Sequence, residues 1–179
     1  MMTARVALAG LAIACHPAAR GPEGVPLPPP IATATLLDST GTQVGVATFS
    51  RVAGGARLGV SVSGLGPGPH GIHIHERGEC AGPAFTSAGG HLNPDRRVHG
   101  LENPAGPHAG DLPNLLVDAD GSADTIFAVS PRLLDSGDRS LFRAGGTAVV
   151  VHAEQDDQRS DPSGGSGARV ACGVVERES

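Results

Sequence analysis

The sequence predicts an all-β domain, a sandwich or barrel of eight short antiparallel strands. Short runs rich in β-branched residues recur along the chain, and turn-forming residues separate them. No stretch shows the long amphipathic pattern of a packed helix, which also favours a β-sandwich or barrel. In chain order the runs are Ala32–Leu37, Gln43–Phe49, Arg57–Ser63, Gly71–His75, Asn114–Asp118, Ala123–Ala128, Thr147–Ala153 and Arg169–Val175.

Two short turns and two long breaks, which we expect to be loops, separate some of these runs. Ser39–Gly41 separates the first two runs, and Asp118–Gly121 separates the fifth and sixth, so both pairs are expected to form antiparallel hairpins. The breaks, Arg77–Pro113 and Glu154–Ala168, are rich in Gly, Pro, Ser and Asp. Loops of this length in a compact domain are commonly functional or disordered, and the first one carries three histidines.

Length and charge narrow the possible functions. The 179 residues fit one domain, and their formal net charge is −5. A nucleic-acid-binding protein needs a basic face, so this balance argues against that class of partner. All thirteen basic residues are Arg, and any attraction of a small anion must come from a local group.

The N-terminus has the pattern of an export signal. Residues 1–14 combine Arg5 with an apolar stretch and small residues before Cys15. Residues 12–14, which precede Cys15, resemble a bacterial lipobox, although Leu11 lies one position earlier than the leucine of that motif. Lipidation of Cys15 is therefore expected, and ordinary cleavage is the alternative. Residues 15–30 then form a Pro- and Gly-rich tether, and the domain is expected over residues 31–179, in the periplasm or cell envelope.

Cysteine usage agrees with export. Cys80 and Cys172 form an even pair within the domain, and such a pair in an exported protein is first interpreted as a disulfide. Cys15 is left over. Lipidation would account for it.

Histidines carry the chemical signal. His73 and His75 alternate with Ile72 and Ile74, so the period of two in a strand places both imidazoles on one face and both isoleucines on the other. Further candidates lie in the first long loop and at the end of the seventh run; they are His91, His99, His108, Asp111 and His152. Imidazoles with one carboxylate suit Zn²⁺, and an all-imidazole set suits Cu(II), but the spacing alone leaves their division open.

Several segments resemble the copper–zinc superoxide dismutase family, in order, from about residue 31 to 176. The resemblance implies a Greek-key eight-stranded sandwich or barrel whose two long loops form the metal site, and an oxidoreductase acting on superoxide. The segments are His73–His75, Ser87–Pro94, His99–Gly100, His108–Leu112, Val150–His152 and Ala168–Gly173.

The resemblance also implies the two metal sites. Copper would be held by His73, His75, His91 and His152, and zinc by His91, His99, His108 and Asp111. The shared imidazole of His91 would bridge both cations and accept a proton when copper is reduced, while zinc would remain redox-silent.

Supporting residues follow from the same resemblance. Asp156 would accept hydrogen bonds from His73 and His99, with neighbouring Asp157 as the rival for this role. Arg169 would attract and orient superoxide beside copper, because a guanidinium is permanently charged and presents a fork of donors. The disulfide would join Cys80 to Cys172, and the chain would be a monomer or a homodimer.

The second long loop departs from the family pattern, because it contains Arg159 but no Lys to guide superoxide. Two other functions are alternatives to the enzyme: a non-catalytic copper and zinc module, such as a buffer or carrier, and a structural sandwich that binds zinc only for stability. The first would be expected to lose a copper ligand or Arg169, and the second would leave His152 and the His73–His75 pair without purpose.

Overall fold

A computed structural model describes residues 28–179. The predicted signal segment, the Cys15 lipidation site and most of the predicted tether lie outside the described residues. Within them, the strands run antiparallel to their neighbours and all eight predicted runs form strands. The strands are β1 (Ala32–Asp38), β2 (Gln43–Val52), β3 (Gly55–Val62), β4 (Gly68–His70), β5 (Ile72–His75), β6 (Leu115–Val117), β7 (Ala123–Val129), β8 (Ala148–His152), β9 (Arg169–Val174) and β10 (Glu176–Arg177).

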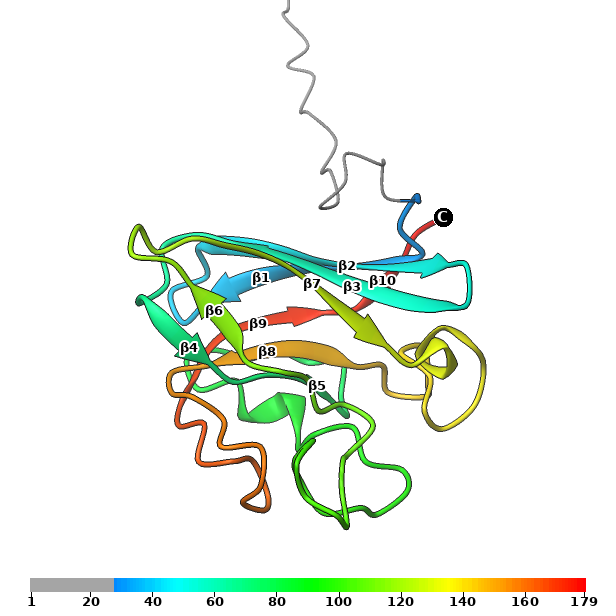
Figure 1. Cartoon of the computed structure of the whole chain (residues 1–179). Helices are drawn as coiled ribbons and strands as arrows, with labels where there is room; N and C mark the ends of the chain where they lie inside the picture. Colours follow the sequence, from blue (N-terminus) through cyan, green and yellow to red (C-terminus); the bar gives the residue numbers. More distant parts are fainter. Residues whose placement is uncertain (1–27) are drawn as a thin grey trace, which may run out of the picture.

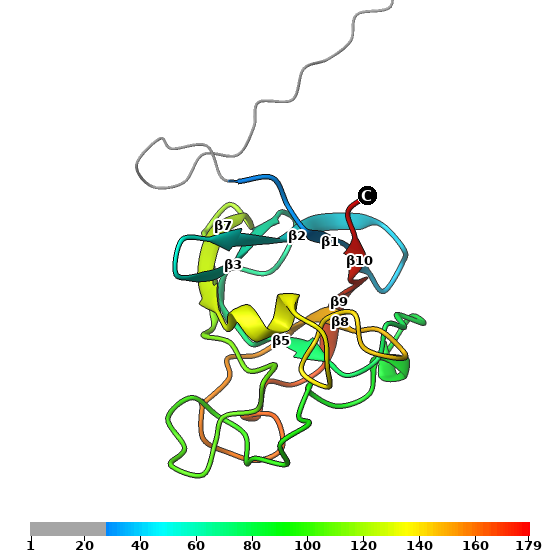
Figure 2. The same cartoon turned by 90° about the vertical axis from the view of Figure 1, so that its right-hand side faces the viewer.

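The main sheet curls upon itself as a flattened half-barrel (Figures 1 and 2). Its order is β5-β8-β9-β1-β2-β3-β7, with β10 paired to the start of β1. Neighbours such as β5 and β8, or β3 and β7, are distant in sequence, so connections cross the ends of the barrel in the Greek-key manner. The all-β Greek-key prediction is therefore confirmed.

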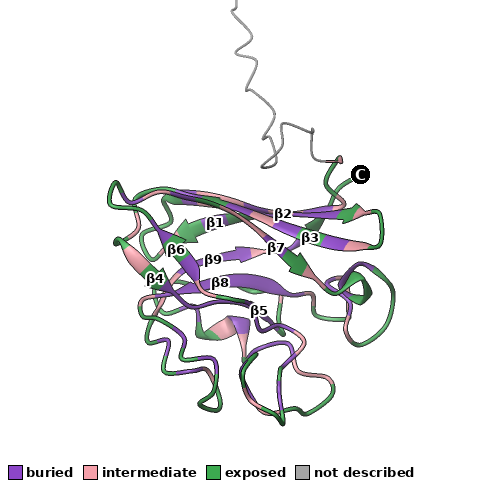
Figure 3. Cartoon of the chain, viewed as in Figure 1, coloured by how far each residue is buried: buried purple, intermediate pink, exposed green. Residues whose placement is uncertain are grey.

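A continuous core fills the space inside the curl. Alternate residues of β1, β2 and β3 point inward, and Figure 3 shows the resulting alternation of buried and exposed positions. Leu36, Phe49 and Leu58 are fully buried there, together with Ile72 and Ile74 of β5. Burying an aliphatic or aromatic side chain of this size stabilises the fold by about 1.5–3 kcal/mol.

One of the two expected hairpins is wrong. The Asp118–Gly121 turn forms, since the Gly121 amide donates to the Asp118 carbonyl at 2.9 Å, yet the strands on either side join different sheets. β6 has three residues and pairs with three-residue β4, whereas seven-residue β7 pairs along β3. The longer ladder satisfies more backbone groups of β7 than β6 could.

Four short elements of residues 28–179 were not predicted from the sequence. These are β4, β10 and two 3₁₀ helices, η1 (Thr86–Ala88) and η2 (Pro131–Leu134). They are too brief to produce a hydrophobic period. No helix among residues 28–179 is long and apolar enough to cross a membrane.

The two long loops lie on the same side of the barrel, next to β5 and β8 (Figure 1). The predicted disulfide is present and joins Cys80 in the first loop to Cys172 on β9, 92 positions apart. Closing so long a segment stabilises the folded protein by about 4–5 kcal/mol in the chain-entropy model. It also fixes the first loop against the strand that begins with Arg169.

Candidate metal centre

Strand β5 supplies the first two functional side chains. Its four residues are all buried, but Ile72 and Ile74 belong to the barrel core while His73 and His75 lie on the opposite face, under the loops. The alternation expected from the sequence is therefore observed.

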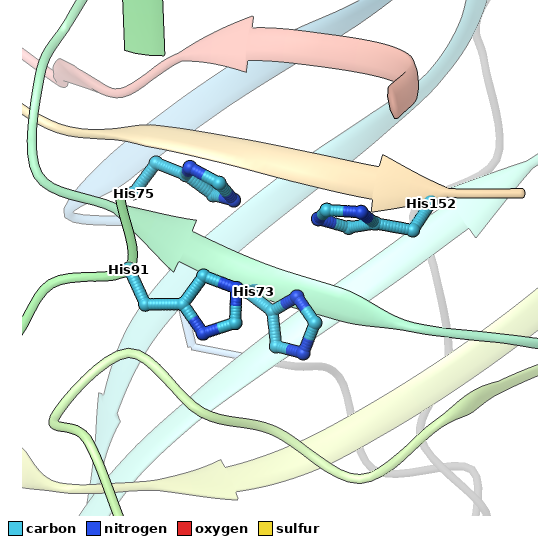
Figure 4. A group of neighbouring side chains, drawn as sticks. All are labelled: His73, His75, His91 and His152. Atoms are coloured by element: carbon cyan, nitrogen blue, oxygen red, sulfur yellow. The ribbon is translucent and has the colours of Figure 1, made fainter. Parts of the chain in front are cut away.

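Four imidazoles converge on one point. His73 and His75 are joined by His91, which forms a β-bridge with His75, and by His152 at the end of β8 (Figure 4). One nitrogen from each lies within 4.8 Å of the corresponding nitrogens of the others. All four residues are buried.

The nitrogens that face this point have no hydrogen-bond partner among residues 28–179. They are His73 Nδ1, His75 Nε2, His91 Nε2 and His152 Nε2. Buried polar atoms are nearly always paired, so four orphaned acceptors in one place fit a cation, and an all-imidazole set fits copper.

Hydrogen bonds at the other ring nitrogen determine the tautomer of His75 and His152. His75 Nδ1 donates to the Gly89 carbonyl at 3.0 Å, and His152 Nδ1 donates to the Gly167 carbonyl at 3.3 Å. Each bond keeps the proton on Nδ1 and leaves Nε2 free to bind a metal.

A second group lies on the other side of His91 and consists of His91, His99, His108 and Asp111. The Oδ1 atom of Asp111 lies 2.9, 3.1 and 3.3 Å from Nδ1 of His91, His99 and His108 respectively. Its Oδ2 accepts the backbone amides of Gly100 and His108 at 2.8 and 2.9 Å. Three imidazoles and one carboxylate are a donor set typical of Zn²⁺.

A close backbone contact brings Asp111 to this group. The amides of Ile74 and Gly110 donate to Gly110 and Leu92 carbonyls respectively, both at 2.9 Å, which ties the loop to β5. A Cβ atom at Gly110 would lie 2.1 Å from the Ile74 carbonyl oxygen. Only glycine permits this approach.

Asp156, rather than Asp157, connects the two groups. Its carboxylate oxygens lie 2.7 Å from His73 Nε2 and 3.0 Å from His99 Nε2. The Asn114 side chain holds the Asp156 backbone through two bonds of 2.8 Å. Asp157 instead accepts bonds from its own turn, including one from Ser160 Oγ at 2.5 Å.

Arg169 stands at the wall of an open cleft of about 530 Å³ that is also lined by His75, His91 and His152. Its guanidinium donates to the carbonyls of Phe85 and Gly89, both at 2.6 Å. The Gly89 carbonyl thus receives both Arg169 and His75. Gly89 has φ 74°, ψ −153°, a conformation essentially restricted to glycine.

Residues 43–175 match the family model described as copper/zinc superoxide dismutase. The chain belongs to this family. Its members use copper and zinc, in agreement with the two donor sets.

Individual relatives support the copper/zinc superoxide dismutase assignment. Cu-Zn superoxide dismutase 2 of Aquifex aeolicus is 44% identical over 147 residues, covering 80% of this chain and 85% of the relative. An extracellular Cu-Zn superoxide dismutase of Caenorhabditis elegans is 38% identical, covering 74% of this chain and 60% of the relative. A solved SOD-like protein from Bacillus subtilis superposes with a TM-score of 0.74 at 39% identity, covering 79% of this chain and 96% of that one.

The structure brings together all seven candidate metal ligands in two groups that share His91, and it places Arg169 and Asp156 beside them. Sequence reasoning missed Asn114 and the Gly89 carbonyl. Neither leaves a recognisable signal, because an isolated Asn is common in loops and a backbone acceptor is independent of residue type. The positive φ of Gly89 is equally invisible in a loop with many glycines.

Burial changes the charge state of the site. Desolvation lowers the pKa of His91 to about 4 and that of His152 to about 3. For Asp156, burial alone would raise the pKa, but hydrogen bonds from His73 and His99 outweigh it and lower the pKa to about 2. Near neutral pH the imidazoles of His91 and His152 are thus neutral and the Asp156 carboxylate is ionised.

The metal-free protein should therefore lose stability in mild acid. Between the ordinary histidine pKa of 6.5 and the folded value of about 4, the unfolded chain binds protons at His91 and His152 that the folded chain does not bind. The free energy of unfolding then falls as the pH decreases through this window. Urea unfolding of the metal-free protein measures it, and His152→Gln should weaken the dependence. A constant unfolding free energy from pH 7 to pH 5 would contradict this prediction.

Proposed function

We propose that this protein converts two superoxide anions and two protons into one dioxygen and one hydrogen peroxide, with copper at His73, His75, His91 and His152. The observation that carries the proposal is the set of four orphaned imidazole nitrogens, three of whose residues line the same cleft as Arg169. A buried donor set for structure alone would not need an approach from solvent or a free guanidinium beside it.

Zinc is proposed at His91, His99, His108 and Asp111. When bound, copper supplies one-electron transfer to and from superoxide, and zinc supplies a fixed positive charge without redox chemistry. Around them, Asp156 holds His73 and His99 through their remote nitrogens and so keeps both groups in one orientation.

His91 is proposed to handle one of the protons. Its Nδ1 faces Asp111 and its Nε2 faces the other three orphaned nitrogens, so a proton can reside on Nε2 when that atom is not engaged. The Asp111 carboxylate lies 2.9 Å from Nδ1 and keeps Nε2 on the side of the other three orphaned nitrogens. A peroxide dianion is strongly basic and would take up such a proton readily.

Arg169 provides the positive end of the cleft. Two backbone carbonyls neutralise none of its charge, and no carboxylate of residues 28–179 lies within ion-pair distance of its guanidinium. Burial nevertheless lowers its pKa, although a guanidinium remains charged throughout the ordinary pH range. The side chain is thus preorganised to attract a small anion.

The decisive test measures copper and zinc per chain and superoxide removal in the purified protein. We expect both metals and a turnover that cyanide inhibits, because cyanide binds an accessible copper. In His152→Ala, loss of one copper donor should reduce turnover to background while zinc stays bound. Zinc alone without turnover in the wild type would refute the proposal, and both metals without turnover would indicate the non-catalytic module instead.

Arg169→Ala should lower the second-order rate constant by about tenfold and flatten its dependence on ionic strength, because the local attraction for the anion is lost. Metal content should be unchanged, since the side chain binds no member of either donor set. Arg57→Ala is the matched control, as Arg57 is an exposed residue of β3. Equal effects in the two variants would attribute the change to net charge rather than to the cleft.

We further propose that the protein is exported and lipidated at Cys15. The apolar N-terminal pattern and the disulfide within the domain support this, because disulfides persist in oxidising compartments. Cell fractionation should find the protein with the membrane and Cys15→Ser in the soluble fraction. A wild-type protein that is wholly soluble would exclude the lipid.

A further inference from the structure

In four of the six imidazoles of the centre, the ring nitrogen that points away from the donor group is hydrogen-bonded to an acceptor. For His73 and His99 this acceptor is Asp156, and for His75 and His152 it is a backbone carbonyl. His91 uses both nitrogens within the two groups.

The outward nitrogen of the sixth imidazole, His108, lies at longer range from a carboxylate that no motif singled out. Its Nδ1 faces Asp111 and His91, at 3.3 and 3.4 Å from Oδ1 and Nδ1 respectively. Its Nε2 points the other way and lies 3.8 Å from Asp161 Oδ1.

Asp161 belongs to the other long loop and lies beside two members of the zinc group. Its Oδ1 also accepts the backbone amide of His99 at 2.7 Å. One carboxylate oxygen therefore faces two of the four proposed zinc ligands from outside. The side chain is 56% exposed and lines the same cleft as Arg169, so this contact sits where solvent meets the metal centre.

We propose that Asp161 is a second positioning carboxylate of the zinc group, acting on His108 and His99 from the cleft side as Asp156 acts on His73 and His99 from the buried side. This inference rests on the zinc assignment in the proposed function. The negative charge favours the proton on His108 Nε2, which leaves Nδ1 as the donor atom. The hydrogen bond from the His99 amide to Asp161 holds the His99 backbone in place.

The neighbouring acidic residue of the same loop shows that the position is specific. Asp157 is the acidic residue that precedes Asp161 in this loop. Its carboxylate accepts the backbone amides of Arg159 and Ser160 and contacts no imidazole of the described residues. Of these loop carboxylates, Asp156 and Asp161 face histidines and Asp157 does not. Asp157 is therefore a matched control.

The position also carries a cost for catalysis. Asp161 adds a negative charge to a cleft that must attract an anion, alongside Glu76 and opposite to the charge of Arg169. A carboxylate at this place is more readily understood if it serves the metal.

The test follows zinc rather than turnover. The zinc-loaded wild type, Asp161→Asn, Asp161→Ala and Asp157→Asn are mixed with a coloured chelator, and the rate of zinc release is recorded. We expect release about tenfold faster in Asp161→Ala, with a smaller acceleration in Asp161→Asn and wild-type behaviour in Asp157→Asn. The side-chain oxygen of Asn can still accept the hydrogen bond from the His99 amide, but Asn lacks the negative charge that faces His108.

A spectroscopic readout separates positioning from general loosening of the loop. Cobalt(II) loaded in place of zinc has visible bands that respond to donor geometry, and these should shift in both Asp161 variants and not in Asp157→Asn. Release rates and bands that match Asp157→Asn would overturn the inference while leaving the proposed function intact. A wild type that retains no zinc would refute the zinc assignment itself.

Discussion

A single imidazole ties the two halves of the metal centre together. His91 contributes one nitrogen to each donor group, so the groups cannot move independently without rotating or displacing this ring. Three contacts hold that ring in place. Asp111 receives its Nδ1, the β-bridge to His75 fixes its backbone, and the packing of Leu92 into the core anchors the next residue.

The loops that surround His91 are held from two sides by different kinds of bond. On the barrel side, the disulfide and the backbone contacts at Gly110 join the first loop to β9 and β5. The buried Asp156 and the exposed Glu102–Arg159 ion pair connect the first loop to the second. The exposed ion pair contributes little free energy, so the buried hydrogen bonds and the covalent link provide most of the constraint.

Much of this arrangement could be predicted from the sequence. The runs that became β1, β2, β3, β7, β8 and β9 have strong β propensity, and the alternation of His and Ile in β5 directly gives two faces. The pairing of β6 with β4 could not be predicted, because partner choice depended on the lengths of strands that are distant in the chain. The roles of Asn114 and Asp161 depend on contacts between two loops, and a local pattern carries no information about them.

The Gly89 carbonyl has a consequence for how this centre tolerates change. It accepts hydrogen bonds from both His75 and Arg169, so the spacing between the guanidinium and the imidazoles is set by a main-chain atom. Side chains along the rim of the cleft, such as Ser163, do not take part in this spacing. Substitutions at the rim can thus change the surface of the cleft over evolutionary time, while the Arg169 guanidinium keeps its position relative to the donor nitrogens.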